Sequence, residues 1–260
     1  MNQQNFLSEN TLGNLKTISR EKCEEWGGEW VDGEAHVTKI DSLSTDYTRK
    51  TEVRSEKDAI EAFEHYEEYF THVLDRDTEN NEFAVFLPCG SQKPIGSSSV
   101  HKKKLNALEA SGLLEVADVY IMSEPCVIVP HDERLKVPPT NYDFPPEYTS
   151  KEDCPQVFEL FVEKLTMFLE EKDYDTIFSY LVEGHQNKMD EAVQNTDVEQ
   201  VKIPGASYNP ETENCSGDYF KSVEDMALKI KATIEIKHES GWLPETTEDK
   251  VLEYYQGYLN

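Results

Sequence analysis

The most informative segment for the fold class is Phe83-Ala84-Val85-Phe86-Leu87. It is an uninterrupted apolar run of strand length, and such a run favours a strand buried on both faces, as in a parallel sheet covered by helices. Residues 116–122 and 176–181 have a similar character and predict two further strands. Helical patterns lie between these runs, so we expect right-handed crossovers. The predicted fold class is α/β, with a mainly parallel central sheet flanked by helices in three layers.

The helices are predicted from their N-caps and apolar periods. Ser55, with Asp58 three residues later, is typical of an N-cap, and the apolar stripe that follows extends this helix to about residue 75. A second helix begins near His101 and a third near Asp153. The sequence therefore alternates between strands and helices through most of its length.

The remaining segments define the expected domain organisation. We expect an N-terminal extension over residues 1–54 and one α/β core over residues 55–260, with a helical C-terminal part over 218–260. The proline-rich stretch 123–148 lacks a helical period and predicts a long ordered loop, a kind of segment that is usually functional. Residues 187–217 are rich in polar side chains and predict an irregular connection.

The charge of the chain restricts its partners. Asp and Glu number 52 against 25 Lys and Arg, so the formal net charge is −27. Such a protein is repelled by nucleic acid and by anionic membranes at ordinary salt. Either it never meets a polyanion, or it works in concentrated salt, which screens the repulsion. We favour the second explanation, that of a halophilic cell.

Membrane segments and cysteine motifs are also absent from the sequence. No run approaches the roughly 20 apolar residues of a membrane span, and the N-terminus lacks the basic and apolar parts of a signal peptide. We expect a cytoplasmic protein without membrane partners. The five cysteines form no C-x-x-C pair, so neither a disulfide framework nor a structural zinc site is predicted, and we expect no cofactor.

Residues 88–101 form the loop that carries the candidate chemistry. The loop leaves the end of a buried strand and enters a helix N-terminus, where ligands of open α/β sheets bind. Cys89 could act as a nucleophile activated by Lys93 and the helix end, or it could simply pack beneath a Ser/Gly loop. His101 titrates near neutrality. The candidate substrate-binding residues here are Pro88, Gly90, Ser91, Lys93, Pro94 and Ser98.

A basic cluster follows this loop. Lys102, Lys103 and Lys104 are consecutive in a strongly acidic chain. Such a run is by default a solvated helix face, but beside this loop it could equally bind phosphate. We therefore name these lysines as candidate nucleic-acid contacts and leave both interpretations open.

The loop resembles a known signature. The pattern P-C-x3-K-P-x3-S-x2-H is similar to the signature of archaeosine synthase, a family that modifies archaeal tRNA, and it is matched here by Pro88, Cys89, Lys93, Pro94, Ser98 and His101. The family usually has a tyrosine after the Lys-Pro pair, where this chain has Ile95.

The resemblance continues downstream. Family members have a Ser-Pro-containing loop that ends in Val-Pro, followed by a Tyr-Asp-x-Pro element. Corresponding elements occur here in the same order, as Ser123-Glu124-Pro125, Val129-Pro130 and Tyr142-Asp143-Phe144-Pro145. The resemblance covers roughly residues 55–185, the best-matched part of the core. Usual family members are much longer and end in an RNA-binding module.

The resemblance implies a specific reaction. Archaeosine synthases act on 7-cyano-7-deazaguanine in tRNA and add an amino-acid nitrogen to its nitrile, so the chain would be a transferase. The donor is an amino acid such as lysine or glutamine, and some lineages use a separate radical enzyme. Related 7-deazaguanine chemistry modifies viral DNA. The implied partners are therefore tRNA or modified DNA, the donor, and a separate radical enzyme or RNA-binding subunit, in an archaeon or its virus.

The candidate residues fit an addition to a nitrile, which needs a base for the amine and an acid for the nitrile nitrogen. Asp143 is a candidate for the base or for binding the donor ammonium, and His101 for the acid. Alternatively, Cys89 attacks the nitrile to give a thioimidate. The motif match adds Ser123 and Tyr142 as candidate substrate-binding residues. Both the direct and the covalent route stay open at this point.

Alternatives exist for the site and for the function. Asp143 could merely form a turn. A metal site of Cys89, His101 and Asp143 is disfavoured because no ligand-pair spacing supports it, so no metal is expected. The same α/β core could instead be a non-catalytic base- or nucleotide-binding module of a modification complex. It could also be a glycosylase-like hydrolase that releases a free base.

Overall fold

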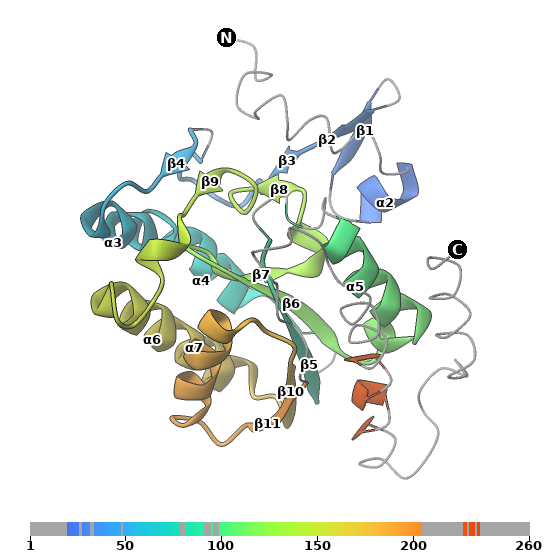
Figure 1. Ribbon diagram of the computed structural model, residues 1–260. Helices are drawn as coiled ribbons and strands as arrows, with labels where there is room; N and C mark the ends of the chain where they lie inside the picture. Colours follow the sequence, from blue (N-terminus) through green and yellow to red (C-terminus); the bar gives the residue numbers. More distant parts are fainter. Residues whose placement is uncertain are drawn as a thin grey trace.

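The structure is a computed structural model of the 260-residue chain. It describes residues 20–25, 28–31, 34–47, 49–78, 82–90, 95, 99–203, 226–227, 229–231 and 233–234. Figure 1 shows these segments around one central sheet.

The central sheet confirms the predicted fold class. It has five strands in the order β11-β10-β5-β6-β7. All neighbours are parallel except β6 and β7, which are antiparallel. The three strands predicted from the sequence are β5, β6 and β10, and they lie side by side at its centre. The bounds are β5 Phe83–Pro88, β6 Asp118–Ser123, β7 Val127–Pro130, β10 Thr176–Ser179 and β11 Glu199–Lys202.

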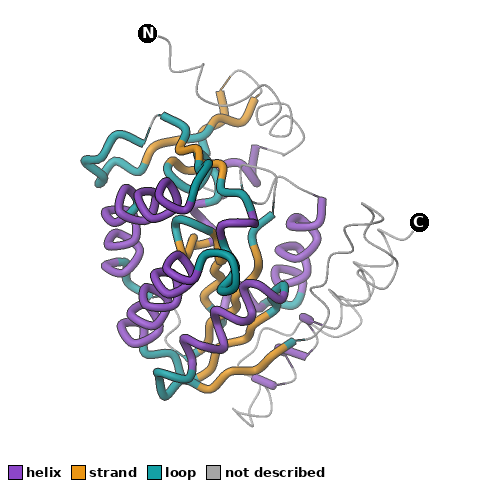
Figure 2. The backbone as a smooth tube through the Cα atoms, turned by 60° about the vertical axis from the view of Figure 1, so that its left-hand side comes forward, coloured by secondary structure: helices purple, strands orange, loops and turns teal. Residues whose placement is uncertain are grey.

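Helices cover both faces of this sheet (Figures 1 and 2). The connection from β5 to β6 leads toward the β7 edge of the sheet, whereas the connection from β10 to β11 leads toward the opposite edge. Right-handed crossovers therefore place their helices on opposite faces. Helix α5 covers one face, and α3, α4, α6 and α7 pack on the other, which gives three layers. The bounds are α3 Glu56–His65, α4 Glu67–Asp75, α5 Ser99–Ala110, α6 Pro155–Lys172 and α7 Glu183–Val193.

The predicted cap at Ser55 is confirmed, but the single helix predicted after it is divided into α3 and α4. The side chain of Ser55 accepts a hydrogen bond from the backbone N–H of Asp58 at 3.1 Å. Tyr66 separates the two helices, with φ −92° and ψ 8°. Apolar side chains continue across this break, because Phe63 and Phe70 are both buried, and for this reason the sequence pattern did not reveal it.

The proline-rich stretch 123–148 is not one irregular loop. It contains β7 and two short strands, β8 (Lys136–Val137) and β9 (Tyr142–Asp143). These pair in parallel with β3 (Thr38–Lys39) and β4 (Thr51–Glu52). Strands of two residues are too short for an alternating pattern to show in the sequence.

Residues of the expected N-terminal extension are consequently attached to the core. Tyr47 and Val53 are buried in it. Glu68 of α4 accepts hydrogen bonds from the backbone N–H groups of Ser44 and Thr45 at 2.6 and 2.7 Å. Hydrogen bonds from these two residues lower the pKa of Glu68 to about 2. Before this segment, α2 (Arg20–Glu25) precedes an antiparallel hairpin of β1 (Glu29–Val31) and β2 (Glu34–His36).

The prediction of an irregular connection over residues 187–217 is wrong in its first part. Most of α7 and all of β11 lie there. Two of the four buried residues of α7 are His185 and Lys188, so its inward face has no apolar period. Further along the chain, the described residues of 226–234 are helical and include buried Met226 and Ile230, as the sequence predicts. No helix in the described part of the chain is long and apolar enough to cross a membrane.

Candidate functional site

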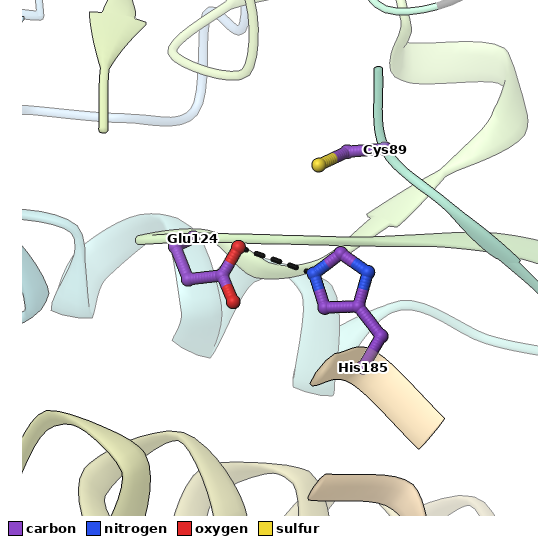
Figure 3. A group of neighbouring side chains, drawn as sticks. All are labelled: Cys89, Glu124 and His185. Carbon is purple, nitrogen blue, oxygen red and sulfur yellow. Dashed lines mark hydrogen bonds and ion pairs between the residues drawn. The ribbon is translucent and has the colours of Figure 1, made fainter. Parts of the chain in front are cut away.

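Three functional side chains meet where the central strands of the sheet end. Cys89 follows β5, Glu124 follows β6, and His185 lies in the first turn of α7, after β10. Because these three strands are parallel, their carboxyl ends lie at one edge of the sheet, where open α/β sheets bind ligands. One thiol, carboxylate and imidazole atom from each residue lie within 4.8 Å of one another (Figure 3).

Glu124 connects this group to α7 through two buried contacts. Its Oε2 lies 3.2 Å from Nε2 of His185, and its Oε1 lies 2.5 Å from Nζ of Lys188. The side chains of Glu124, His185 and Lys188 are 7%, 8% and 1% exposed. His185 and Lys188 are three residues apart in a helix, so both reach the same carboxylate from one helix face.

The electrostatics of the site keep Glu124 ionised. Burial raises the pKa of Glu124, but the charges of Lys188 and His185 and their hydrogen bonds outweigh burial, so the pKa lies well below the usual 4.5. A carboxylate only accepts hydrogen bonds, so Nε2 of His185 is the donor. The other ring nitrogen, Nδ1, is buried without a hydrogen-bond partner among the described residues.

Cys89 brings a thiol to within 4.8 Å of a ring nitrogen of His185. Its backbone N–H donates to the carbonyl of Met122 at 3.0 Å, which extends the ladder between β5 and β6. Its side chain is partly buried, whereas the other cysteines in the described residues, Cys23, Cys126 and Cys154, are buried. A thiol, a base that removes its proton, and a carboxylate that orients the base are the groups of nucleophilic catalysis.

Two predicted substrate-binding residues lie next to this group. The hydroxyl groups of Ser123 and Tyr142 are hydrogen-bonded to each other, and both residues are buried. Burial raises the pKa of Tyr142 well above 10, so its side chain stays a neutral phenol that can donate or accept a hydrogen bond. Ser123 precedes Glu124 directly, so the structure brings this pair to the same sheet edge.

A family model now places the chain among known sequences. The model described as Domain of unknown function (DUF5591) matches residues 64–216, more than half of the chain. The chain belongs to the DUF5591 family. No curated protein matches it. A solved structure that resembles this DUF5591 protein is the crystal structure of AF0587, a protein of unknown function, with 17% sequence identity and a TM-score of 0.43. The likeness covers 72% of this chain and 56% of that one.

The predicted role of Asp143 is not supported by its position in the DUF5591 protein. Asp143 follows Tyr142 in β9, and successive side chains of a strand point to opposite sides. Tyr142 points inward, and Asp143 points outward with a 64% exposed side chain, 3.5 Å from Nζ of Lys50. It is not one of the residues gathered around Cys89. Glu124 is the carboxylate that the structure places there instead.

The other residues of the signature have varied positions. Pro88 ends β5, and Gly90 follows Cys89 with partial exposure. His101 is buried in α5. Its role as an acid stays a prediction. Ile95, which replaces the usual tyrosine, is buried in the core. The remaining predicted residues of the loop lie outside the described residues, namely Ser91, Lys93, Pro94 and Ser98.

The three lysines of α5 do not form a common exposed face. Lys104 is only 3% exposed, and its Nζ lies 5.4 Å from the centre of the Tyr180 ring. In this position Lys104 is not available to a polymer at the surface. The prediction that Lys104 contacts nucleic acid does not agree with its burial. Lys103 is partly buried, and the side chain of Lys102 is outside the described part of the structure. Contacts of these two lysines with nucleic acid stay predictions.

Sequence reasoning missed Glu124, His185 and Lys188. A signal for Glu124 was present, since it stands inside the Ser-Glu-Pro element that resembles the archaeosine synthase pattern. A signal for the other two was weaker. A histidine and a lysine three residues apart, soon after a buried strand, indicate a polar helix face that points at the sheet edge.

Proposed function

We propose that this protein modifies a 7-deazaguanine base in nucleic acid, adding an amino-acid nitrogen to the nitrile of 7-cyano-7-deazaguanine. Two observations on the sequence support the choice of substrate. Residues 88–101 resemble the archaeosine synthase signature, and domains of the DUF5591 type are known from archaeosine-synthase-related proteins. The observation that carries the proposal is the partly buried thiol of Cys89 within 4.8 Å of the buried pair of Glu124 and His185.

The first step is covalent. Nδ1 of His185 takes the proton of the Cys89 thiol, and the thiolate sulfur attacks the nitrile carbon. A C–S bond forms while one electron pair of the C≡N bond moves to nitrogen. The nitrogen then takes the proton from His185. The result is a thioimidate on Cys89, formed without an oxidant or a reductant.

The second step releases the product. The donor amine adds to the thioimidate carbon and passes a proton to His185, the C–S bond breaks, and the electron pair of that bond returns to sulfur. His185 returns the proton to the sulfur, so the enzyme is regenerated and the base carries an amidine. Glu124 orients the imidazole and stabilises its protonated form, a role that requires a fixed carboxylate. Lys188 provides that fixation through its 2.5 Å contact.

The substrate and its polymer make further contacts in this proposal. Ser123 and Tyr142 provide hydroxyl groups for the polar edge of the base. The strong negative charge of the chain requires screening by salt when tRNA or modified DNA approaches. Lys102 and Lys103 are the residues proposed to face the polymer.

The test is a reconstituted reaction at high salt. Purified protein is incubated with nucleic acid containing 7-cyano-7-deazaguanine and with labelled lysine or glutamine, and the nucleosides are analysed by mass spectrometry. Cys89→Ala and His185→Ala should lose the labelled product, while Cys154→Ser, a buried cysteine at the start of α6, should retain it. Binding without any labelled product would indicate a binding module, and a released free base would indicate a hydrolase. Either result contradicts the proposal.

A further inference from the structure

We propose that Cys89, Glu124 and His185 also form a binding site for one zinc-class divalent cation. Each residue offers one ligand atom, and these atoms lie within 4.8 Å of one another. Among the described residues, this is the group in which thiol, imidazole and carboxylate ligands gather at such distances. Figure 3 shows that the three side chains come from three separate segments and converge on a common space. The metal site rests on this geometry alone, and only its expected effect on activity rests on the proposed function.

One pair of the candidate ligands has the spacing of a tetrahedral zinc site. Bonds of about 2.0–2.3 Å from zinc to nitrogen, oxygen and sulfur place neighbouring ligand atoms roughly 3.3–3.8 Å apart. Nε2 of His185 and Oε2 of Glu124 are 3.2 Å apart, so this pair is near the required spacing. The sulfur of Cys89 lies within 4.8 Å of a ring nitrogen of His185 and a carboxylate oxygen of Glu124, so metal binding would draw it closer to both.

The chemistry of the ligands selects the metal. A thiolate and an imidazole favour zinc and related transition metals over magnesium or calcium, which prefer oxygen ligands. Lys188 occupies Oε1 of Glu124, so one oxygen of the carboxylate is left for the metal. Such outer contacts orient the ligands of metal sites. Three protein ligands leave a fourth position open to water or a small ligand.

Metal binding and thiol chemistry exclude each other at this site. A sulfur that is bonded to zinc and a His185 that is bonded through a ring nitrogen are both withdrawn from proton transfer and from attack on a nitrile. The metal-bound form is therefore an inactive state, and the metal-free form carries the thiol chemistry. Zinc should consequently inhibit the protein, and a chelator should restore it.

The test uses the purified full chain, stripped with a chelator and titrated with Co²⁺ in the absence of nucleic acid. We expect saturation at one equivalent and a near-ultraviolet charge-transfer band from sulfur to cobalt, which Zn²⁺ abolishes by displacement. Cys89→Ser should lose the band and bind at least roughly tenfold more weakly, because the sulfur bonded to the metal is lost. The matched control Cys154→Ser should keep both. A band that persists in Cys89→Ser would overturn the proposal, as would the absence of saturation in the wild-type protein.

A second measurement avoids dependence on the variants. The alkylation rate of Cys89 by iodoacetamide is followed by peptide mapping in the wild-type protein, with and without one equivalent of Zn²⁺. At least tenfold protection of Cys89 is expected, and equal rates would overturn the metal site. Neither measurement includes a nucleobase, so failure of the proposed reaction and failure of the metal site are distinguishable.

Discussion

The ammonium group of Lys188 lies 2.5 Å from the carboxylate of Glu124, and both side chains are buried. The contact joins α7 to the residue that follows β6. The same carboxylate contacts His185 at 3.2 Å, so one buried ion pair fixes the orientation of the candidate base beside Cys89. The stability of this region and its chemistry therefore depend on the same pair.

Breaking this pair should destabilise the protein strongly. Lys188→Met leaves the carboxylate of Glu124 buried without its main partner, and removal of one partner of a buried pair costs about 3–5 kcal/mol. The double variant Glu124→Leu/Lys188→Met should recover most of the loss, because no charge stays unpaired. Urea denaturation followed by circular dichroism measures the free energy of unfolding.

An exposed ion pair provides the control for this prediction. Lys151 and Glu191 form a contact of 2.6 Å with side chains that are 58% and 38% exposed. Lys151→Met should therefore cost less than about 1 kcal/mol. Equal losses in the buried and exposed variants would show that Lys188 does not stabilise a buried charge.

The stability should fall in acid because of a second polar cluster. Arg76 contacts Asp132 at 2.9 Å and Glu133 at 2.7 Å. Burial raises the pKa of Asp132, but the charge of Arg76 and its hydrogen bonds outweigh burial, so the pKa lies below the usual 3.8. For Glu133, burial is outweighed by the hydrogen bond from His72 and by Arg76, so the pKa lies below the usual 4.5. Carboxyl groups with a lowered pKa in the folded state stabilise that state at pH values above their pKa in the unfolded state.

The contribution of Asp132 and Glu133 to the free energy of unfolding should be present above about pH 4.5. It should be lost as the pH falls through the lower pKa values that these groups have in the folded state. Arg76→Met removes the cation that contacts both carboxylates, so its free energy of unfolding should fall less steeply between roughly pH 5 and pH 3 than that of the wild-type protein. Arg54→Met, which removes the exposed partner of Glu52, serves as the control and should keep the wild-type slope. Identical slopes for all three proteins would contradict the assignment.

The N-cap of α3 allows a smaller test of the fold. Ser55→Ala removes the acceptor of the hydrogen bond from the backbone N–H of Asp58, and loss of such a cap costs about 1 kcal/mol. Ser55→Asp keeps an acceptor at this position and should stay close to the wild-type stability. Thermal denaturation of the two variants makes the comparison. A loss of the same size in Ser55→Asp would indicate that the hydrogen bond is not the cause.

The activity should require concentrated salt. A chain of net charge −27 repels a polyanion at low ionic strength, and at about 1 M salt the Debye length is only about 3 Å. The specificity constant kcat/KM for a polymer substrate should therefore rise with KCl, whereas that for the free modified nucleoside should change little. A maximum at low ionic strength for the polymer would refute this interpretation of the charge.

The sequence predicted the centre of the fold well, because β5, β6 and β10 are apolar runs and the helices between them have clear apolar stripes. It failed where tertiary pairing decides the structure. Strands β8 and β9 have two residues each, and their partners lie far away in the chain. Local patterns contain no information about such pairings.

The candidate site shows the same division between local and tertiary information. Cys89 was found because a motif and a strand end coincide there. His185 and Lys188 were missed because buried charged residues conceal the apolar period of a helix, and α7 was therefore not predicted. Glu124 was missed although it stands inside the Ser-Glu-Pro element. Asp143 resembled a family residue by its position in the chain, but the alternation of β9 directs its side chain outward. Only the assembled sheet brings Glu124 next to Cys89.

The role of Cys89 as the nucleophile can be measured from the mass of the intact protein after incubation with 7-cyano-7-deazaguanine nucleoside, without an amine donor. We expect a gain of one nucleoside mass in the wild-type protein, located at Cys89 by peptide mapping and absent from Cys89→Ala. Addition of the amine donor should then remove the adduct and release the amidine. An unmodified wild-type protein that still forms the amidine, or an adduct of the same yield on Cys89→Ala, would contradict the role of Cys89 as the nucleophile.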